Sequence, residues 1–285
     1  MRLFFFFGGL ITIATLIFIN AQEIAKTLPF SAEKRFVRPY ESMVNYFNKG
    51  DELPPRHAEI KTYLAELAET LSHEMALPED YTLSVHYIDS NIINAFAMLG
   101  GHVFITRGLL DALESENSLS LVMAHEIAHV KHRDPLAGMG RGLAIQLILS
   151  FITGQSGSGS TLAASGGELG LLHFSREQES AADVVGMRAL HGLYGHVQGA
   201  GGLFELLIDD MSSEDEKEVY NARMRDVEEA LQGWLSTHPE LADRLQAMND
   251  LSERENWPTQ GELTPLPAWL KEAVKPRLLP EAGQD

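Results

Sequence analysis

Hydrophobic residues recur at helical spacing early in the chain and then change to a strand-like pattern. Residues 57–76 carry apolar side chains three or four positions apart, which predicts an amphipathic helix. The next segment is rich in β-branched and aromatic residues that alternate with polar ones, and it predicts strands that form a small antiparallel or mixed sheet. The predicted strands are Tyr81–Asp89, Ile93–Met98 and His102–Thr106.

A more continuous apolar stretch follows the strands. A short helix is expected at Gly108–Glu114, and a longer one from about Ser118, which is an N-cap candidate, to Pro135, which would end it. Residues 121–130 of the longer helix are mostly apolar, and neither Gly nor Pro interrupts them. A helix that is apolar on most sides belongs in a protein core.

The second half of the chain alternates between helices and loops. Leu143–Phe151 is apolar but too short to span a membrane, so it predicts a buried helix. Gly154–Gly167 is rich in Gly and Ser, and it could be a mobile flap or an ordinary surface loop. Further helices are predicted within Leu171–Leu193 and at Val197–Met211, Glu216–Leu235 and Glu240–Leu251, before an irregular, proline-containing tail at 253–285 that Trp257 and Trp269 could pin to the body.

The N-terminus reads as a targeting segment. Arg2 precedes an apolar run of 17 residues, Leu3–Ile19. A cleaved signal peptide needs small residues before the cut, and Asn20-Ala21 is a usable site although Ile19 at the −3 position is large. An uncleaved anchor needs about 17–25 apolar residues, so the run is also long enough to be an anchor.

Residues 1–21 are therefore predicted to be a signal peptide or an N-terminal membrane anchor, with cleavage slightly favoured. Residues 22–285 are predicted to form a single domain whose core covers about 57–252. Between the leader and this core, residues 22–56 carry mixed charges, and at best one short helix is expected there, around Tyr40–Asn48.

Composition excludes several functions. The formal net charge of −18 argues against nucleic acid as a partner and against docking on anionic lipid through a basic patch. The chain has no cysteine, which excludes disulfides, thiolate zinc sites and a cysteine nucleophile. A hydrophobic content of 45% is typical of a globular protein with an ample core.

The buried helix carries the motif His-Glu-x-x-His at His125, Glu126 and His129. Residues four apart lie on one face of an α-helix, so both imidazoles can reach one metal ion. Glu126 is then free to face a metal-bound water. An exposed helix with two incidental histidines is the alternative, but polar groups in an apolar helix need partners, and a metal is a natural one.

Two acidic residues follow about fifty positions later, on another predicted helix. Glu179 and Asp183 form the pattern Glu-x-x-x-Asp on one helix face. Glu179 could complete a His-His-Glu zinc site with one open position, and Asp183 could hold the outer N–H of a ligand histidine. His86 and His102 lie in predicted strands, and each is expected to be a packing or surface residue instead of a ligand.

Four stretches of the chain resemble the HtpX-like and CAAX-prenyl-protease-like gluzincin metallopeptidases, and are most similar to short, exported, BepA-like bacterial members. The chain lacks the membrane helices that flank the motif in polytopic members and the helical repeats of longer BepA-like proteins. The matching stretches are Asn94–Leu110, Leu121–Asp134, Ser175–Met187 and Ser236–Leu245.

The resemblance implies a fold and a set of roles. The fold would be α+β, a mostly helical zincin domain with a small β-sheet above the active-site helix. His125, His129 and Glu179 would bind Zn²⁺, Glu126 would be the general base, and Asp183 would orient a ligand histidine, most simply His125. The strand after the glycine pair would be an exposed edge that pairs with an extended substrate. The residues expected to contact substrate are Asn94, Ala95, Gly101, His102 and Val103.

The same resemblance implies that the stretch around His238 lies near the metal cleft. Pro239 biases His238 towards an extended backbone, so its side chain would project from a loop before the helix at Glu240–Leu251. His238 could stabilise the developing oxyanion or occupy the open zinc position as a latch, or His-Pro could be only a helix-start turn. Arg244 could share the oxyanion role or pair with Asp243 or another carboxylate.

The sequence thus predicts a zinc endopeptidase that acts on unfolded or misassembled envelope proteins. Its location would be the periplasm of a Gram-negative bacterium, or the inner membrane facing the periplasm, with membrane association through residues 3–19. An envelope chaperone or adaptor that holds clients with little cleavage is the alternative. The intact Glu126 favours the enzyme, because a protein that only binds clients has no use for a general base.

Overall fold

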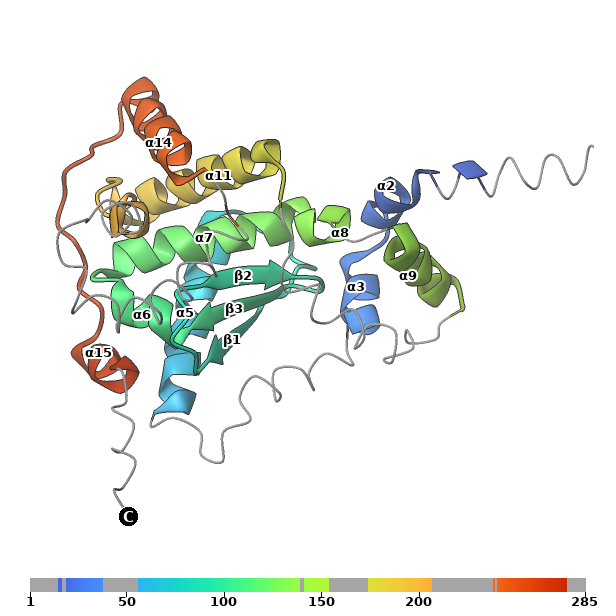
Figure 1. The fold of residues 1–285 in the computed structure, drawn as a ribbon, viewed down its shortest axis with the longest axis horizontal. Helices are drawn as coiled ribbons and strands as arrows, with labels where there is room; N and C mark the ends of the chain where they lie inside the picture. Colours follow the sequence, from blue (N-terminus) through green and yellow to red (C-terminus); the bar gives the residue numbers. More distant parts are fainter. Residues whose placement is uncertain are drawn as a thin grey trace, which may run out of the picture.

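The computed structural model describes residues 15–16, 19–37, 56–138, 141–153, 174–206, 238 and 240–275. Helices predominate, and the strands form one small sheet (Figure 1). The elements are α2 (Ala21–Lys26), α3 (Phe30–Val37), α5 (His57–Glu74), β1 (Ser84–Ile88), β2 (Ala95–Met98), β3 (His102–Thr106), α6 (Arg107–Ala112), α7 (Glu116–His132), α8 (Asp134–Gly138), α9 (Arg141–Thr153), α11 (Arg176–Tyr194), α14 (Leu241–Glu255) and α15 (Ala268–Val274).

The sheet is mixed, with the order β1-β3-β2. β2 and β3 form an antiparallel hairpin, and β1 pairs with β3 in parallel. The hairpin turns at Gly100 and Gly101, whose φ angles of 78° and 81° favour residues without a Cβ. The prediction that β3 is an exposed edge is wrong, because β3 is the central strand. Among the described strands, β2 is the edge that lies beside α7 (Figure 1).

Helices α5 and α7 pack against one face of the sheet and enclose the main core. Strand residues that point to this face, such as Val103 and Ile105, are fully buried. α7 is buried along almost its whole length, as its continuous apolar sequence predicts. Its cap is Ser115, whose Oγ accepts a hydrogen bond from N of Ser118, so the cap lies three residues earlier than predicted. The helix ends at the left-handed residue Arg133, and Pro135 lies in α8.

α11 packs along α7 (Figure 1) and positions a second set of polar residues against it. Its start is defined by a capping box, in which the side chains of Ser175 and Gln178 bond to each other's backbone. Gly186 allows the two helices to approach closely, because a Cβ there would lie 3.4 Å from the side chain of Leu121. The packing of α11 on α7 holds the predicted Glu-x-x-x-Asp face against the His-Glu-x-x-His face.

The segment after the leader forms two helices that the mixed charges of residues 22–56 did not predict. α2 packs against α8 and α9, and α3 against α9, around a second apolar cluster. Phe36 and Ala25 are fully buried in this cluster. Glu33 of α3 is also buried, and it accepts a hydrogen bond of 2.6 Å from Nε of Arg133 at the end of α7. The N-terminal helices are thus packed onto the helix that carries the candidate site.

The C-terminal part is more regular than the predicted irregular tail. α14 extends to Glu255, and α15 follows the proline-rich stretch and buries Leu270 and Val274. Both tryptophans make the expected ring contacts with the body. Trp257 stacks on His191 of α11 with ring centroids 5.0 Å apart, and Trp269 meets Tyr63 edge-on.

Several predicted features lie outside the described residues. They include most of the leader, the helix around Tyr40–Asn48, the loop Gly154–Gly167 and the helix Glu216–Leu235. In the described residues, no helix combines the length and the apolar character that crossing a membrane requires.

Candidate metal centre

Three side chains that the sequence singled out meet between α7 and α11. Nε2 of His125 lies 3.1 Å from Nε2 of His129, because the two residues are one turn apart on the same side of α7. The carboxylate of Glu179 on α11 lies 3.4 Å from Nε2 of His125 and 3.5 Å from Nε2 of His129. The fold therefore brings together the three predicted metal ligands.

The spacing of these atoms fits a tetrahedral metal ion. Ligand atoms about 2.0–2.1 Å from a tetrahedral zinc ion stand about 3.3 Å apart. His238 adds a fourth atom at this spacing, since its Nδ1 lies 3.3 Å from Nε2 of His125 and 3.0 Å from Oε1 of Glu179. Ligand-capable atoms of His125, His129, Glu179 and His238 all lie within 4.8 Å of one another, and all four residues are buried.

Asp183 and Arg244 support the cluster from α11 and α14. Oδ1 of Asp183 lies 3.0 Å from Nδ1 of His125, the ring nitrogen that faces away from the other ligand atoms. Arg244 donates from Nε and Nη2 to the two oxygens of Asp183, at 2.8 and 2.7 Å. Its Nη1 lies 2.7 Å from Oε2 of Glu179. Arg244 therefore fixes the orientation of two carboxylates at once, and it pairs with these instead of with Asp243.

His129 has a carboxylate partner that the sequence analysis did not identify. Its Nδ1 donates to Oδ2 of Asp134 over 2.9 Å, and Oδ1 of Asp134 accepts 2.8 Å from Nε2 of Gln178 on α11. Phe174 stacks on the ring of His129 with centroids 3.9 Å apart. The sequence does contain a signal for it, because Asp134 follows the second histidine of the motif by five residues. Its role depends on the left-handed turn at Arg133, which folds it back onto the helix.

Glu126 is fully buried beside the cluster. Its Oε1 lies 3.3 Å from Nε2 of His238, and no described residue donates a well-aligned hydrogen bond to either carboxylate oxygen. Burial alone would raise the pKa of Glu126, but the nearby charge of His238 and of the other two histidines lowers it below its ordinary value. The side chain is thus a buried, ionised acceptor beside Nε2 of His238.

The other pKa values follow the same balance between burial and neighbouring charge. Burial lowers the pKa of His129, but its hydrogen bonds to Asp134 and Glu179 outweigh this and raise it to about 9. For Glu179 and Asp183, burial raises the pKa, but hydrogen bonds outweigh this and lower it: from three histidines to Glu179, and from Arg244 and His125 to Asp183. A buried anionic pocket of this kind has the charge and the donor set that a divalent cation needs.

The residues predicted to contact substrate are divided between two strands. Gly101, His102 and Val103 belong to the turn and to β3, whose backbone groups are shared with β1 and β2. Asn94 and Ala95 lie at the start of the edge strand β2. His102 lies apart from the candidate metal ligands: its Nδ1 is 2.8 Å from Nε2 of His86, on the sheet face away from the main core.

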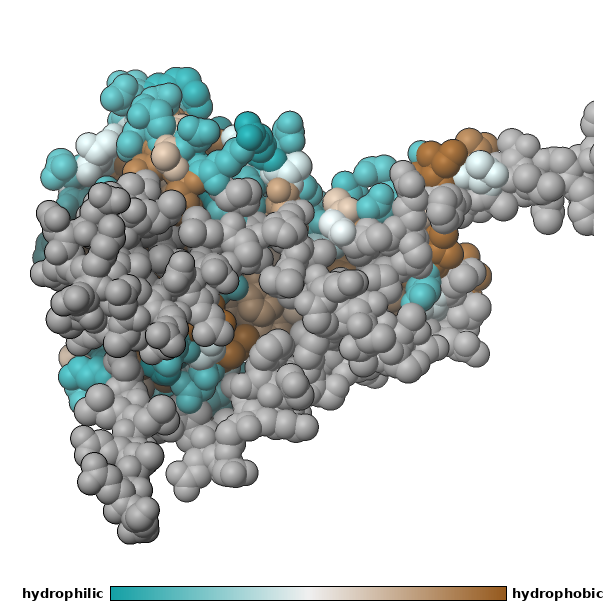
Figure 2. Space-filling model, in the orientation of Figure 1, coloured by the Kyte–Doolittle hydropathy of each residue, from teal (hydrophilic) through white to brown (hydrophobic). Residues whose placement is uncertain are grey.

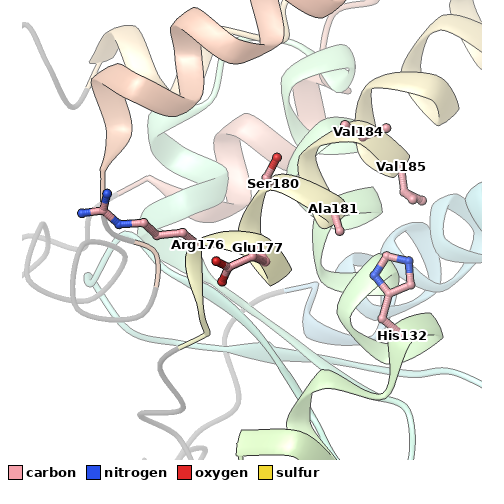
Figure 3. Close-up of a pocket in the computed structure, with 7 residues that line it drawn as sticks. All are labelled: His132, Arg176, Glu177, Ser180, Ala181, Val184 and Val185. Carbon is pink, nitrogen blue, oxygen red and sulfur yellow. The ribbon is translucent and has the colours of Figure 1, made fainter.

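Two hollows lie near the cluster on α11. A surface groove of about 620 Å³ follows the outer face of α11 next to His132 (Figure 3), and it contains none of the four ligand-capable residues. A smaller cavity of about 370 Å³ lies between α11 and α14 and reaches Glu179, Asp183 and Arg244. The first groove is thus separate from the candidate centre, whereas the second adjoins the residues that support it.

Comparison with known families agrees with this geometry. Residues 54–252 match the family model described as Peptidase family M48. This match covers more than half of the chain and includes both helices of the metal centre. The protein therefore belongs to peptidase family M48.

Individual relatives match over shorter segments. The Beta-barrel assembly-enhancing protease of Escherichia coli (strain K12) is 28% identical over 169 residues, which are 55% of this chain and 32% of the relative. The protein of the same name from Yersinia pestis is 31% identical over 37% of this chain and 24% of the relative. Metalloprotease YcaL of Escherichia coli (strain K12) is 30% identical over 56% of this chain and 63% of the relative. The chain thus spans less than two thirds of each of these relatives.

Proposed function

We propose that the protein hydrolyses peptide bonds at a zinc ion held by His125, His129 and Glu179. The observation that carries this proposal is the tetrahedral spacing of their ligand atoms inside a buried, anionic pocket. Zinc bound there lowers the pKa of a coordinated water towards neutrality and polarises the scissile carbonyl. His-His-Glu is also a donor set of known catalytic zinc sites.

Glu126 is the general base. Its carboxylate is ionised, buried next to His238 and without a well-aligned hydrogen-bond donor among the described residues. Such an oxygen can accept the proton of an attacking water and then pass it to the leaving amine. Asp183 lies beside Nδ1 of His125, and Asp134 accepts a hydrogen bond from Nδ1 of His129. These carboxylates hold the two rings with the other nitrogen free to bind the metal.

Arg244 is a positioning residue in this proposal, and it does not stabilise the oxyanion. Its Nε and Nη2 donate to the two oxygens of Asp183, and its Nη1 lies 2.7 Å from Oε2 of Glu179. An oxyanion donor needs an N–H group that points to where the charge develops. Because these two carboxylates engage the guanidinium, its role is to hold the third ligand and the partner of His125 in place.

His238 acts as a latch on the metal site. Its Nδ1 lies 3.3 Å from Nε2 of His125 and 3.0 Å from Oε1 of Glu179, where it could be a fourth ligand, and its Nε2 lies 3.3 Å from Oε1 of Glu126. A catalytic zinc site needs one open position for water or substrate. In the described conformation this position is filled by the imidazole, so the enzyme becomes active when substrate or a partner displaces His238.

The substrate is an unfolded or extended protein segment that adds to β2. The outer edge of β2 has no partner strand among the described residues, and the strand lies beside α7. An extended peptide can pair with such an edge through main-chain hydrogen bonds. Asn94 and Ala95 would then lie along the peptide, whereas Gly101, His102 and Val103 would support the strand from behind.

We place this activity in the envelope of a Gram-negative bacterium, with unfolded or misassembled envelope proteins as substrates. The names of the assembly-enhancing protease relatives support this location, as does the apolar leader. The proposal is tested by incubating the purified chain with an unfolded outer-membrane protein, with and without a zinc chelator. Cleavage that the chelator abolishes supports a protease, and binding without cleavage would support a chaperone or adaptor instead.

A further inference from the structure

Exposed hydrophobic side chains gather at one end of the molecule. Among the described residues, five large apolar side chains stand out as exposed, and four of them lie just before α2 or at the end of α9. α9 packs against α2 and α3 and has no charged residue from 142 to 153. Figure 2 shows hydrophobic surface at this end of the molecule. The four residues are Leu16 and Ile19, both 55% exposed, Phe151 at 41% and Ile152 at 71%.

The predicted signal-peptide cut falls inside a helical segment. N of Asn20 donates to O of Leu16 at 3.0 Å, and N of Ile24 donates to O of Asn20 at 2.9 Å, so helical bonding continues across Ala21. The side chain of Ala21 is fully buried. The adjacent Gln22 donates from Nε2 to O of Ala137 at 2.6 Å, which ties α2 to α8.

Cleavage after Ala21 would conflict with this arrangement. A signal peptidase requires small residues before the cut. Here the −3 position is Ile19. A cut would also remove the buried Ala21 and leave a positive ammonium at the first turn of α2, where the helix dipole disfavours it.

We propose that the leader stays on the chain and that the end of α9 touches the same lipid bilayer. The apolar run of residues 3–19 is long enough to cross the hydrocarbon layer. α9, with 13 residues, is too short to cross it, but its exposed end can enter the interface. The run directly precedes Asn20, the N-cap of α2, and α9 packs against α2. The net charge of −18 does not favour binding to anionic headgroups, so apolar insertion drives the contact.

This surface fixes the catalytic domain relative to the membrane. The hydrogen bond from Gln22 to α8 and the buried pair of Glu33 with Arg133 join the N-terminal helices to the end of α7. α7 carries the metal centre, so the centre is held close to the bilayer and does not move freely on a tether. The inference does not depend on the proposed peptidase mechanism, and its tests do not measure activity.

The first test is the N-terminus of the mature protein. The full chain is produced in a Gram-negative bacterium with a C-terminal tag, extracted with detergent and examined by intact-mass spectrometry. The expected protein retains residues 1–21 and stays in the membrane fraction after alkaline carbonate washing. A mature chain that begins at Gln22 would overturn the proposal.

The second test locates α9 with a fluorescent probe. Because the chain has no cysteine, Ile152→Cys provides a single attachment point for an environment-sensitive dye. The matched control is Leu263→Cys, since Leu263 is the fifth exposed apolar side chain, 39% exposed, and lies outside α2 and α9. Both full-length proteins are placed in vesicles of phosphatidylethanolamine and phosphatidylglycerol that carry nitroxide-labelled acyl chains.

The expected result is at least about twofold stronger quenching at position 152 than at position 263, with little change between low and high salt. Equal quenching at the two positions would show that the end of α9 stays in water, and it would overturn the surface proposed for α9. If high salt removed the difference in quenching between the two positions, electrostatic attraction would hold α9 at the bilayer, which would contradict apolar insertion.

Discussion

Nδ1 of His129 donates a hydrogen bond of 2.9 Å to Oδ2 of Asp134, and both groups are buried. The other oxygen of Asp134 accepts from Gln178, which lies one residue before Glu179 on α11. One carboxylate therefore links the orientation of a ligand histidine on α7 to the helix that provides the third ligand. Supports of this kind keep the ligand nitrogen directed at the metal.

Replacing Asp134 by Asn should weaken zinc binding. The amide keeps the size of the side chain but loses the negative charge that favours a donating Nδ1, so zinc affinity is expected to fall about 10–100-fold. Competition with a chromophoric chelator measures the affinity. Asp250→Asn, at an exposed position on α14, is the control. Equal affinities for both variants and the wild type would show that the bond has no part in binding zinc.

Glu126→Gln tests the general base. The substitution preserves the size of the buried side chain but removes the ionised oxygen, so hydrolysis should fall roughly 10²-fold or more. Zinc content should stay unchanged, since the four ligand-capable groups are intact. Turnover with an unfolded protein substrate and metal analysis of the same sample give both values. Turnover like that of the wild type would end the proposed mechanism.

His238→Ala separates the two roles that the sequence left open. If the imidazole is a latch, its removal opens the fourth position, and peptide hydrolysis should rise several-fold while zinc stays bound. Lost activity with retained zinc would indicate instead that His238 stabilises the oxyanion. His73→Ala is a suitable control, because His73 is exposed on α5 and lies outside the cluster. Turnover and zinc affinity like those of the wild type would leave only a structural turn.

The buried pair of Glu33 and Arg133 should be essential for stability. Arg133→Met leaves the carboxylate of Glu33 buried without its charged partner, and this is expected to cost about 3–5 kcal/mol. Urea denaturation gives the free energy of unfolding. Lys275→Met removes a cation from an exposed pair with Glu272 and should leave the free energy of unfolding nearly unchanged. Similar values for the two variants would mean that the N-terminal helices add little to the fold.

His86 should make stability depend on pH. Burial, together with the neighbouring His102 and Lys61, lowers its pKa from 6.5 to about 4. Because the folded state holds the proton more weakly than the unfolded state, this stabilisation is complete above about pH 6.5 and is lost as the pH falls to 4. The free energy of unfolding of His86→Gln should therefore fall by about 1 kcal/mol less than that of the wild type over this pH range. Urea denaturation at several pH values measures both.

The comparison needs a second histidine variant, since many groups titrate in the same range. His73→Gln, at an exposed position on α5, provides it. A pH dependence of His86→Gln that matches those of the wild type and of His73→Gln would contradict the assignment to His86.

The sequence by itself determined the two helices of the metal centre and the residues they present. The spacing of His125, Glu126 and His129 is a local property of an α-helix, and so is the spacing of Glu179 and Asp183. Apolar neighbours showed that the first of these helices is buried. Short-range geometry and hydrophobic pattern are sufficient for such features, because they do not depend on how distant segments pack.

Only the tertiary structure decided which segments meet. The strand order placed β3 in the middle of the sheet, because the hairpin with β2 covers one edge and β1 covers the other. The pairing of His129 with Asp134 required the turn at Arg133, and the approach of His238 to Glu126 joins positions more than a hundred residues apart. Such contacts depend on the packing of the whole core, which no local pattern encodes.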